Sequence, residues 1–147
     1  MKQALVWLAA ASLLASCASD QAFREGERLF AEGRTEEGLK HLEQVLRDQP
    51  NNVQARTAYL RSKEIMLQRL LTQGEEGLKA ERFDDAATAF REVLKIHPEN
   101  SRAPTGLVAV ETAKANRAML SEAEAMVKRG EIEPARFKLR AILAREP

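Results

Sequence analysis

The sequence predicts an all-α protein that is built from repeated pairs of helices. Residues that favour helix, chiefly Ala, Leu, Glu, Lys and Arg, dominate its 147 residues, and aromatic residues make up only 5%. Pro98 lies 48 residues after Pro50, and Pro147 lies 49 residues after Pro98. A segment with apolar residues at helical spacing precedes each of these prolines. Self-similarity at a nearly constant period indicates an array of helical hairpins.

Each repeat is expected to consist of a helix, a tight turn and a second helix. The turns are predicted at Gly33, at Glu81-Arg82 and at Gly130. Each second helix begins with acidic residues or an early proline, which suit a helix N-terminus, and ends at one of the three repeat prolines. The predicted apolar stripes of the second helices are Leu39, Leu42, Val45 and Leu46; Ala86, Ala89, Phe90, Val93 and Leu94; and Ala135, Leu139, Ile142 and Leu143.

The first helices of the second and third repeats are predicted to be unusually long. No Gly or Pro interrupts residues 53–73 or 107–129, so we expect long helices near 53–80 and 103–129. The alternative is a further hairpin hidden in each stretch. The apolar residues of the first stretch (Leu60, Leu67, Leu70 and Leu71) are read as core, with a coiled-coil seam to a partner as the alternative.

The N-terminal segment has the features of a secretory signal. Lys2 supplies a positive charge, an uncharged run covers residues 4–14, and small residues follow. The run is too short to cross a membrane as a helix. The alternative is that these residues form the first helix of a cytosolic domain.

The end of this segment, LASC at residues 14–17, resembles the lipobox of bacterial lipoproteins. The resemblance implies that residues 1–16 are a signal peptide cleaved between Ser16 and Cys17, and that Cys17 carries a diacylglycerol and a further acyl chain. More than one chain is needed for stable anchoring. Ala18 and Ser19 follow the cysteine instead of an aspartate, which by the rule for such lipoproteins implies the periplasmic face of the outer membrane.

The remainder, residues 17–147, resembles the tetratricopeptide repeat. The residues at its small, small and bulky apolar positions are Gly26, Gly38 and Leu42; Gly74, Ala86 and Phe90; and Ala123, Ala135 and Leu139. The resemblance implies an α-solenoid with units at about 20–50, 53–98 and 101–147, in which the first helices line a protein-binding face. Outward residues of those helices (Arg28, Gln68, Glu75 and Lys79) are the predicted partner-binding residues. The period departs from the 34 residues of that family, which is explained by the elongated first helices.

The chemistry-bearing residues do not form a recognisable catalytic or metal-binding pattern. The chain has 23 Lys and Arg against 22 Asp and Glu, so no basic excess favours nucleic acid. His41 and His97 lie in different repeats without a second ligand at metal spacing. No nucleophile motif or phosphate-binding glycine loop is present. We therefore expect no enzymatic activity, cofactor, metal or small-molecule substrate.

The third repeat raises the question of what covers it. Phe137, Leu139, Ile142 and Leu143 are expected to lack a covering helix, because a repeat array normally ends in a helix with a polar outer face. The sequence therefore suggests a fragment of a longer polypeptide, or a contact with a partner.

A lipobox followed by long-helix repeats is similar to the N-terminal region of secretin-like proteins of type II secretion and type IV pilus systems. The predicted function is a lipid-anchored scaffold at the outer membrane that binds envelope proteins such as secretin or pilus components. The alternative is an accessory lipoprotein that recruits or regulates cell-wall or outer-membrane biogenesis enzymes.

Overall fold

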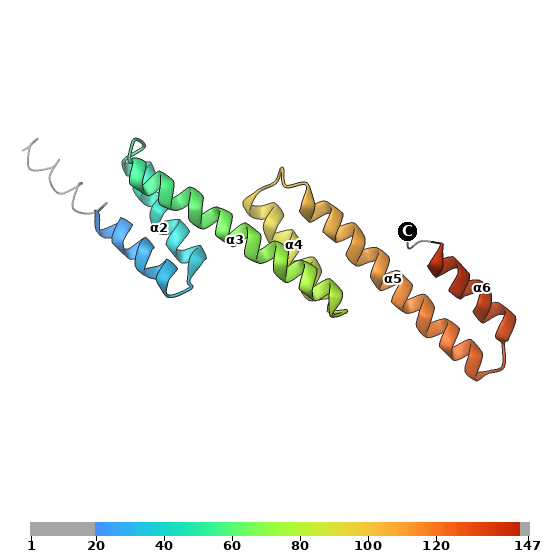
Figure 1. Cartoon of the computed structure of the whole chain (residues 1–147). Helices are drawn as coiled ribbons and strands as arrows, with labels where there is room; N and C mark the ends of the chain where they lie inside the picture. The colour runs from blue at the N-terminus through green and yellow to red at the C-terminus, as the bar shows by residue number, and fades with distance from the viewer. Residues whose placement is uncertain (1–19, 145–147) are drawn as a thin grey trace, which may run out of the picture. The chain divides into compact units, whose positions relative to one another are not determined.

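The computed structural model describes residues 20–144, and the regular structure in this range is entirely α-helical (Figure 1). This confirms the predicted all-α class. The chain forms two compact units, and the division between them lies within α3, between Gln68 and Arg69. The helices are one over 20–31, α2 (Thr35–Asp48), α3 (Val53–Lys79), α4 (Phe83–Ile96), α5 (Arg102–Lys128) and α6 (Ile132–Leu143).

The two long helices predicted from the sequence are confirmed. α3 and α5 each contain 27 residues and run without interruption through the stretches that lack Gly and Pro. The alternative of a hidden hairpin in each stretch is wrong. Each long helix extends well beyond the shorter helix that follows it, since α4 has 14 residues and α6 has 12.

The three hairpin turns share one hydrogen-bonded geometry. In the first, the Gly33 N–H donates to the Phe30 carbonyl (3.0 Å) and the Arg34 N–H donates to the Leu29 carbonyl (2.8 Å). This is the Schellman arrangement, in which the residue after the helix takes a positive φ. The same pair of bonds closes the turns at Glu81 and Gly130. The φ angles at the three equivalent positions are 78° at Gly33, 57° at Glu81 and 80° at Gly130.

The connections between hairpins also repeat. The Asn52 Oδ1 accepts a hydrogen bond from the Ala55 N–H (3.0 Å), and the Asn100 Oδ1 accepts one from the Ala103 N–H (3.0 Å). Each asparagine thereby satisfies a free N–H in the first turn of a long helix. The Asn-containing turns after Pro50 and Pro98 are therefore helix starts.

The first unit packs its three helical segments through small residues. A Cβ built on Gly26 would lie 3.2 Å from the Gly38 carbonyl oxygen, so the helix over 20–31 and α2 approach closely. Leu42 and Val45 of α2 are fully buried with Ala55 of α3. The partly buried residues that pack on this core are Ala22, Phe23, Phe30, Leu46, Ala58 and Tyr59.

The second unit is centred on Phe90 of α4, which is 2% exposed. Its ring lies between two glycines on different helices. A Cβ on Gly74 of α3 would lie 2.7 Å from the ring, and a Cβ on Gly106 of α5 would lie 2.5 Å from it. Because no other residue has room at either position, the aromatic ring and the two glycines form one interlocked contact.

Burial agrees with most of the predicted apolar stripes. The stripes of α2 and α4 are buried, with Leu46 and Leu94 half-buried. In α3, Leu67 and Leu71 are core as expected and Leu70 is half-buried, but Leu60 is exposed and its assignment to the core is wrong. In α6 only Ala135 is buried, and Ile142 is half-buried.

Candidate functional site

The predicted lipidation site lies outside the described residues. Ser16 and Cys17 precede residue 20, so signal cleavage and lipid attachment remain predictions from the sequence. Among residues 20–144, no helix is both long enough and apolar enough to cross a membrane.

Two of the predicted partner-binding residues belong to the first unit and have partners on their own helices. The exposed Arg28 guanidinium pairs with Glu25 (2.5 Å) and Glu32 (2.5 Å). The hydrogen bond from Arg28 lowers the pKa of Glu25 below its ordinary value. Gln68 lies on α3, where its Nε2 donates to the Glu64 Oε1 (2.9 Å). These contacts give no indication of a shared site.

The other two, Glu75 and Lys79, lie one turn apart near the end of α3 in the second unit. Glu75 pairs with Arg102 at the start of α5 (2.6 Å) and thereby links the two long helices. Lys79 is exposed and lines a hollow on the surface of this unit. Of the four predicted residues, Lys79 lines this hollow, and Glu75 lines a smaller one beside Phe90 and Gly106.

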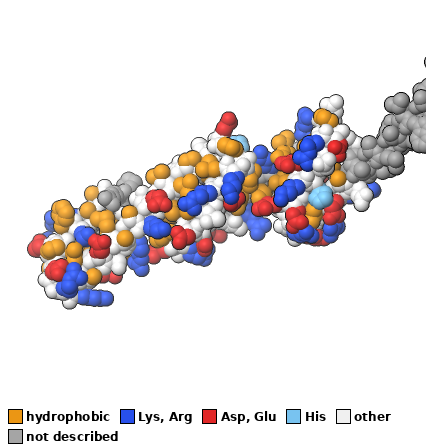
Figure 2. Space-filling model, turned by 180° about the vertical axis from the view of Figure 1, so that it is seen from behind, with side chains coloured by type: hydrophobic (Ala, Val, Ile, Leu, Met, Phe, Trp, Pro, Cys, Tyr) orange, Lys and Arg blue, Asp and Glu red, His pale blue; other side chains and the backbone are white. Residues whose placement is uncertain are grey.

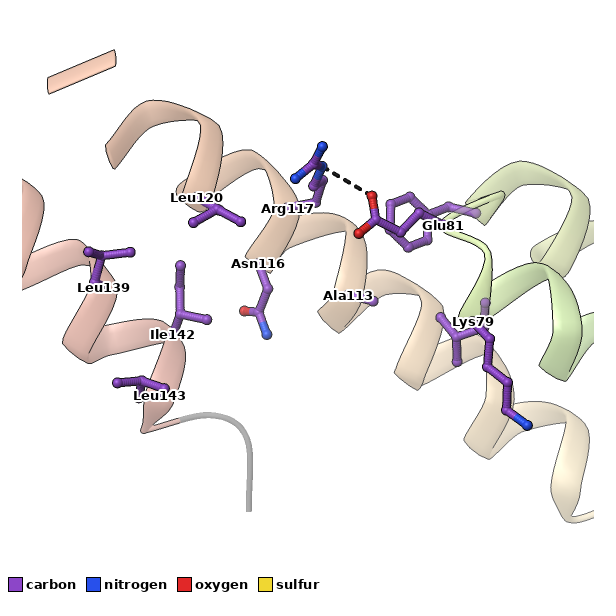
Figure 3. Close-up of a pocket in the computed structure, with 11 residues that line it drawn as sticks. Lys79, Glu81, Ala113, Asn116, Arg117, Leu120, Leu139, Ile142 and Leu143 are labelled. Atoms are coloured by element: carbon purple, nitrogen blue, oxygen red, sulfur yellow. Dashed lines mark ion pairs between the residues drawn. The ribbon is translucent and has the colours of Figure 1, made fainter. Parts of the chain in front are cut away.

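This hollow lies over the middle of α5, between the α3–α4 turn and the C-terminal half of α6 (Figure 3). Its volume is about 560 Å³. Most of its lining is apolar, and the charged pair of Arg117 and Glu81 (3.2 Å) stands at its edge. The lining residues are Leu78, Lys79, Glu81, Phe83, Ala113, Asn116, Arg117, Leu120, Leu139, Ile142 and Leu143.

Asn116 is the feature of the hollow that sequence analysis did not single out. Its side chain points from α5 toward α6 beside Ile142 (Figure 3). Asn116 is only 8% exposed, and its Oδ1 accepts no hydrogen bond from the described residues. A buried acceptor without a partner destabilises the free protein by about 1–3 kcal/mol. The sequence did contain a signal for Asn116. It lies three residues after Ala113 and four before Leu120, a spacing that places a polar residue on the inward, apolar side of the helix.

The α6 helix leaves several large apolar side chains exposed. Leu143 is 70% exposed, Leu139 is 37% exposed and Phe137 is 76% exposed. Leu139 and Leu143 face the hollow, whereas Phe137 lies about 200° around the helix axis from Leu139. Of the four residues expected to lack a cover, Phe137, Leu139 and Leu143 are exposed within residues 20–144, whereas Ile142 is half-buried; Phe137 lies on a separate side of the helix.

The rest of the described surface is mixed in charge and also exposes scattered apolar residues such as Val53, Leu60 and Val108. Figure 2 shows acidic and basic side chains interspersed on the face it presents. Ion pairs join neighbouring helices of the second unit, as in Lys114 with Asp84 (3.1 Å) and Lys138 with Glu122. Within residues 20–144, three or more His, Cys, Asp or Glu side chains nowhere gather in a metal-binding arrangement.

Comparison of the chain with protein-family models, with curated proteins and with solved structures gave no match. The candidate site therefore rests on its geometry. It consists of the hollow over α5 and the apolar side of α6 that continues from it. Such a surface suits the binding of a protein segment, because a contiguous exposed apolar area with a polar edge is typical of interaction sites.

Proposed function

We propose that this chain is a protein-binding scaffold composed of tetratricopeptide-like helical hairpins. The observation that carries the proposal is the exposed apolar side of α6. Leu139 and Leu143 occupy the repeat positions of Phe90 and Leu94, which are buried and half-buried in α4. A hairpin that buries these positions in one repeat and exposes them in the next offers a site that a second protein can cover.

The repeat assignment is supported by features that recur in register. The helix-ending turns have equivalent residues at Gly33, Glu81 and Gly130, and the long helices begin after Asn52 and Asn100. Small residues lie where two helices cross, as at Gly74 against Phe90. These features agree with the tetratricopeptide pattern in the sequence, in which a small residue on the first helix faces a bulky one on the second.

The scaffold works at a membrane in this proposal. The lipobox at residues 14–17 supports lipid attachment at Cys17, and the residues that follow it support the periplasmic face of the outer membrane. Only Ala18 and Ser19 separate Cys17 from the first described residue, so the helix over 20–31 begins close to the lipid. Anchoring raises the local concentration of the binding surface, and two weak attachments then act together. The partners are envelope proteins of a secretion or pilus assembly.

Membrane anchoring is tested by fractionation of cells that produce the chain. Cys17→Ser is expected to move the protein from the membrane fraction to the soluble fraction. Ser19→Ala, which preserves the lipobox, is the matched control and is expected to remain in the membrane fraction. Retention of Cys17→Ser in the membrane fraction would contradict the lipid anchor.

Partner class is tested by a photo-crosslinking amino acid placed at Leu143. Secretin or pilus subunits among the crosslinked proteins would support the proposed assembly role, and cell-wall enzymes would support the alternative accessory role. The same amino acid at the exposed Lys40 of α2 is the control. If Leu143 and Lys40 give the same products, the α6 surface is not a specific binding site.

A further inference from the structure

The second unit contains its own example of a helix docked on the surface that α6 leaves open. The first half of α5 packs against α4, where Gly106 meets the ring of Phe90. Ala103, three residues before Gly106, is fully buried. One residue earlier, Arg102 pairs with Glu75 of α3 (2.6 Å). The docking face of α5 thus consists of a basic residue followed by small residues one and four positions later.

The surface under this docked helix recurs one repeat later. A shift of 49 residues, which relates Pro98 to Pro147, carries Leu78, Phe83, Phe90 and Leu94 onto Val127, Ile132, Leu139 and Leu143. We call the latter four residues the open strip. The first four are buried or half-buried, whereas the residues of the open strip are all exposed, with Val127 and Ile132 each 50% exposed.

The charge at the edge of this surface recurs as well. The same shift carries Glu75, the partner of Arg102, onto Glu124 of α5. Glu124 is exposed and forms no ion pair with another residue in the range 20–144. The open strip therefore repeats both halves of the α4 surface, the apolar residues and the acidic residue beside them.

We infer that the open strip binds an α-helix of another protein that presents the docking face of α5. This helix carries a basic residue opposite Glu124, followed one and four positions later by Ala or Gly. The inference rests on the proposed protein-binding function and specifies the partner's chemistry. Because Leu139 replaces Phe90, alanine suits the second small position. In the first unit, Leu42 is buried with Ala55, and Ala58 packs on the same core.

A further observation favours a partner helix over a second copy of the chain. The two segments with small residues at this spacing, Ala55 to Ala58 and Ala103 to Gly106, already pack within their own units, and the second is the one preceded by a basic residue. A second copy would have to release one of them to bind. The open strip also continues into the hollow through Leu139 and Leu143, so a bound helix has a larger apolar surface to cover than the strip alone.

The inference is tested with a peptide that copies residues 99–115, with Gly106 replaced by Ala. Fluorescence anisotropy of the labelled peptide is measured as the full chain is added. Saturable binding is expected. Leu139→Glu is expected to weaken the binding at least about tenfold, because docking would bury an unpaired charge. Phe137→Glu changes an exposed apolar residue on another side of the same helix and is the matched control, with unchanged affinity expected.

The charge at the edge gives a second, independent measurement. Glu124→Lys is expected to weaken binding of the peptide by roughly two- to fivefold, as is usual for an exposed ion pair. A peptide with Arg102→Glu is expected to restore the affinity toward this variant and to bind the unchanged chain more weakly. A merely structural effect of Glu124→Lys would not be reversed by the peptide.

A free peptide can bind weakly simply because it forms little helix in solution. As a control, the same segment is joined to the chain after Pro147 through a flexible linker, which raises its effective concentration at the open strip. The thermal midpoint of unfolding is expected to rise by several degrees, and Leu139→Glu or Leu143→Glu is expected to abolish the rise. The inference would be overturned if the peptide neither bound saturably nor raised the thermal midpoint when joined to the chain. It would also be overturned if Phe137→Glu weakened peptide binding as much as Leu139→Glu does.

Dimerisation of the unmodified chain through the open strip, seen as a mass in light scattering that halves in Leu139→Glu, would also overturn the inference. If the peptide fails while Leu143 still crosslinks to a specific envelope protein, the partner's chemistry is wrong and the proposed function stands.

Discussion

The helices α4 and α6 occupy equivalent positions in the sequence segments that end at Pro98 and Pro147, yet they differ sharply in burial. α4 is enclosed by the end of α3 on one side and by α5 on the other, and Phe90 is nearly inaccessible. α6 packs on α5 alone among the described helices, and Leu139, at the position of Phe90, is more than a third exposed. The comparison teaches that the apolar stripe of a hairpin defines a surface, and that only the next long helix converts this surface into core.

The largest expected effect comes from truncation of the enclosed member of this pair. Phe90→Ala removes a buried ring between Gly74 and Gly106 and should lower the free energy of unfolding by about 3–5 kcal/mol. Leu139→Ala, the equivalent change in α6, should cost about 1 kcal/mol because less apolar surface leaves contact. Urea unfolding followed by far-ultraviolet circular dichroism measures both. Similar losses in the two variants would mean that α6 is covered in solution.

The next effect tests the match between glycine and aromatic ring. In the second repeat Gly74 faces Phe90, whereas in the third repeat Ala123 and Leu139 occupy these positions. Gly74→Ala should destabilise the chain by about 1–3 kcal/mol, because the new Cβ would lie 2.7 Å from the ring.

A double-mutant cycle isolates this contact. In a chain that already carries Phe90→Leu, Gly74→Ala should cost much less or become stabilising, since alanine is the better helix former. The expected coupling is about 0.5–3 kcal/mol. Additive losses would show that the ring and the glycine do not constrain each other, and that the sequence difference between the two repeats has another origin.

A smaller effect is expected at the turn where the second repeat departs from the other two. Glu81 adopts φ 57°, a conformation in which Gly33 and Gly130 occupy the equivalent positions. Glu81→Gly should raise the free energy of unfolding by about 1 kcal/mol, since a residue with a Cβ is strained there. Glu81→Ala is the control, because it also removes the exposed ion pair with Arg117 but retains the strain. Equal stabilities of the two variants would contradict this interpretation.

The helices and turns could be predicted because each has a local cause. Gly33 and Gly130 favour positive φ, the prolines end helices, and the uninterrupted stretches at 53–73 and 107–129 become long helices. The Glu81 turn was predicted although glutamate does not favour that geometry, because its position is fixed by the repeat period. The position of this turn was therefore predicted from the spacing of the repeats and not from the identity of Glu81.

The candidate site could be predicted only in part. The repeat pattern predicts that a further helix is needed to cover Leu139 and Leu143, so their exposure was expected. The hollow, by contrast, depends on how α3, α4, α5 and α6 pack together in the second unit. The spacing of Asn116 was visible in the sequence, but the burial of its Oδ1 without a partner among residues 20–144 was not, because it depends on how α5 packs against its neighbours. Leu60 shows the opposite error, because an apolar residue at helical spacing was assigned to the core and is exposed. Local spacing gives the direction of a side chain, whereas burial also needs a neighbouring helix.

The smallest effect concerns the first unit, where α3 covers α2 in the way that α5 covers α4. Tyr59 of α3 donates a hydrogen bond from its Oη to the Glu43 Oε1 of α2 (3.1 Å). Partial burial, with the hydrogen bond and the negative charge of Glu43, raises the pKa of Tyr59 above its ordinary value of about 10. Because the folded pKa is the higher one, this contribution to stability is complete below about pH 10 and is lost as the pH rises through the folded pKa.

Tyr59 is the single tyrosine of the chain, so absorbance of the ionised phenol at alkaline pH reports this group alone. The midpoint is expected above that of the urea-unfolded chain. Glu43→Gln should move it part of the way back, because the charge is removed while an acceptor for the hydrogen bond remains. A midpoint equal to that of the unfolded chain would show that the contact between Tyr59 of α3 and Glu43 of α2 does not persist in solution.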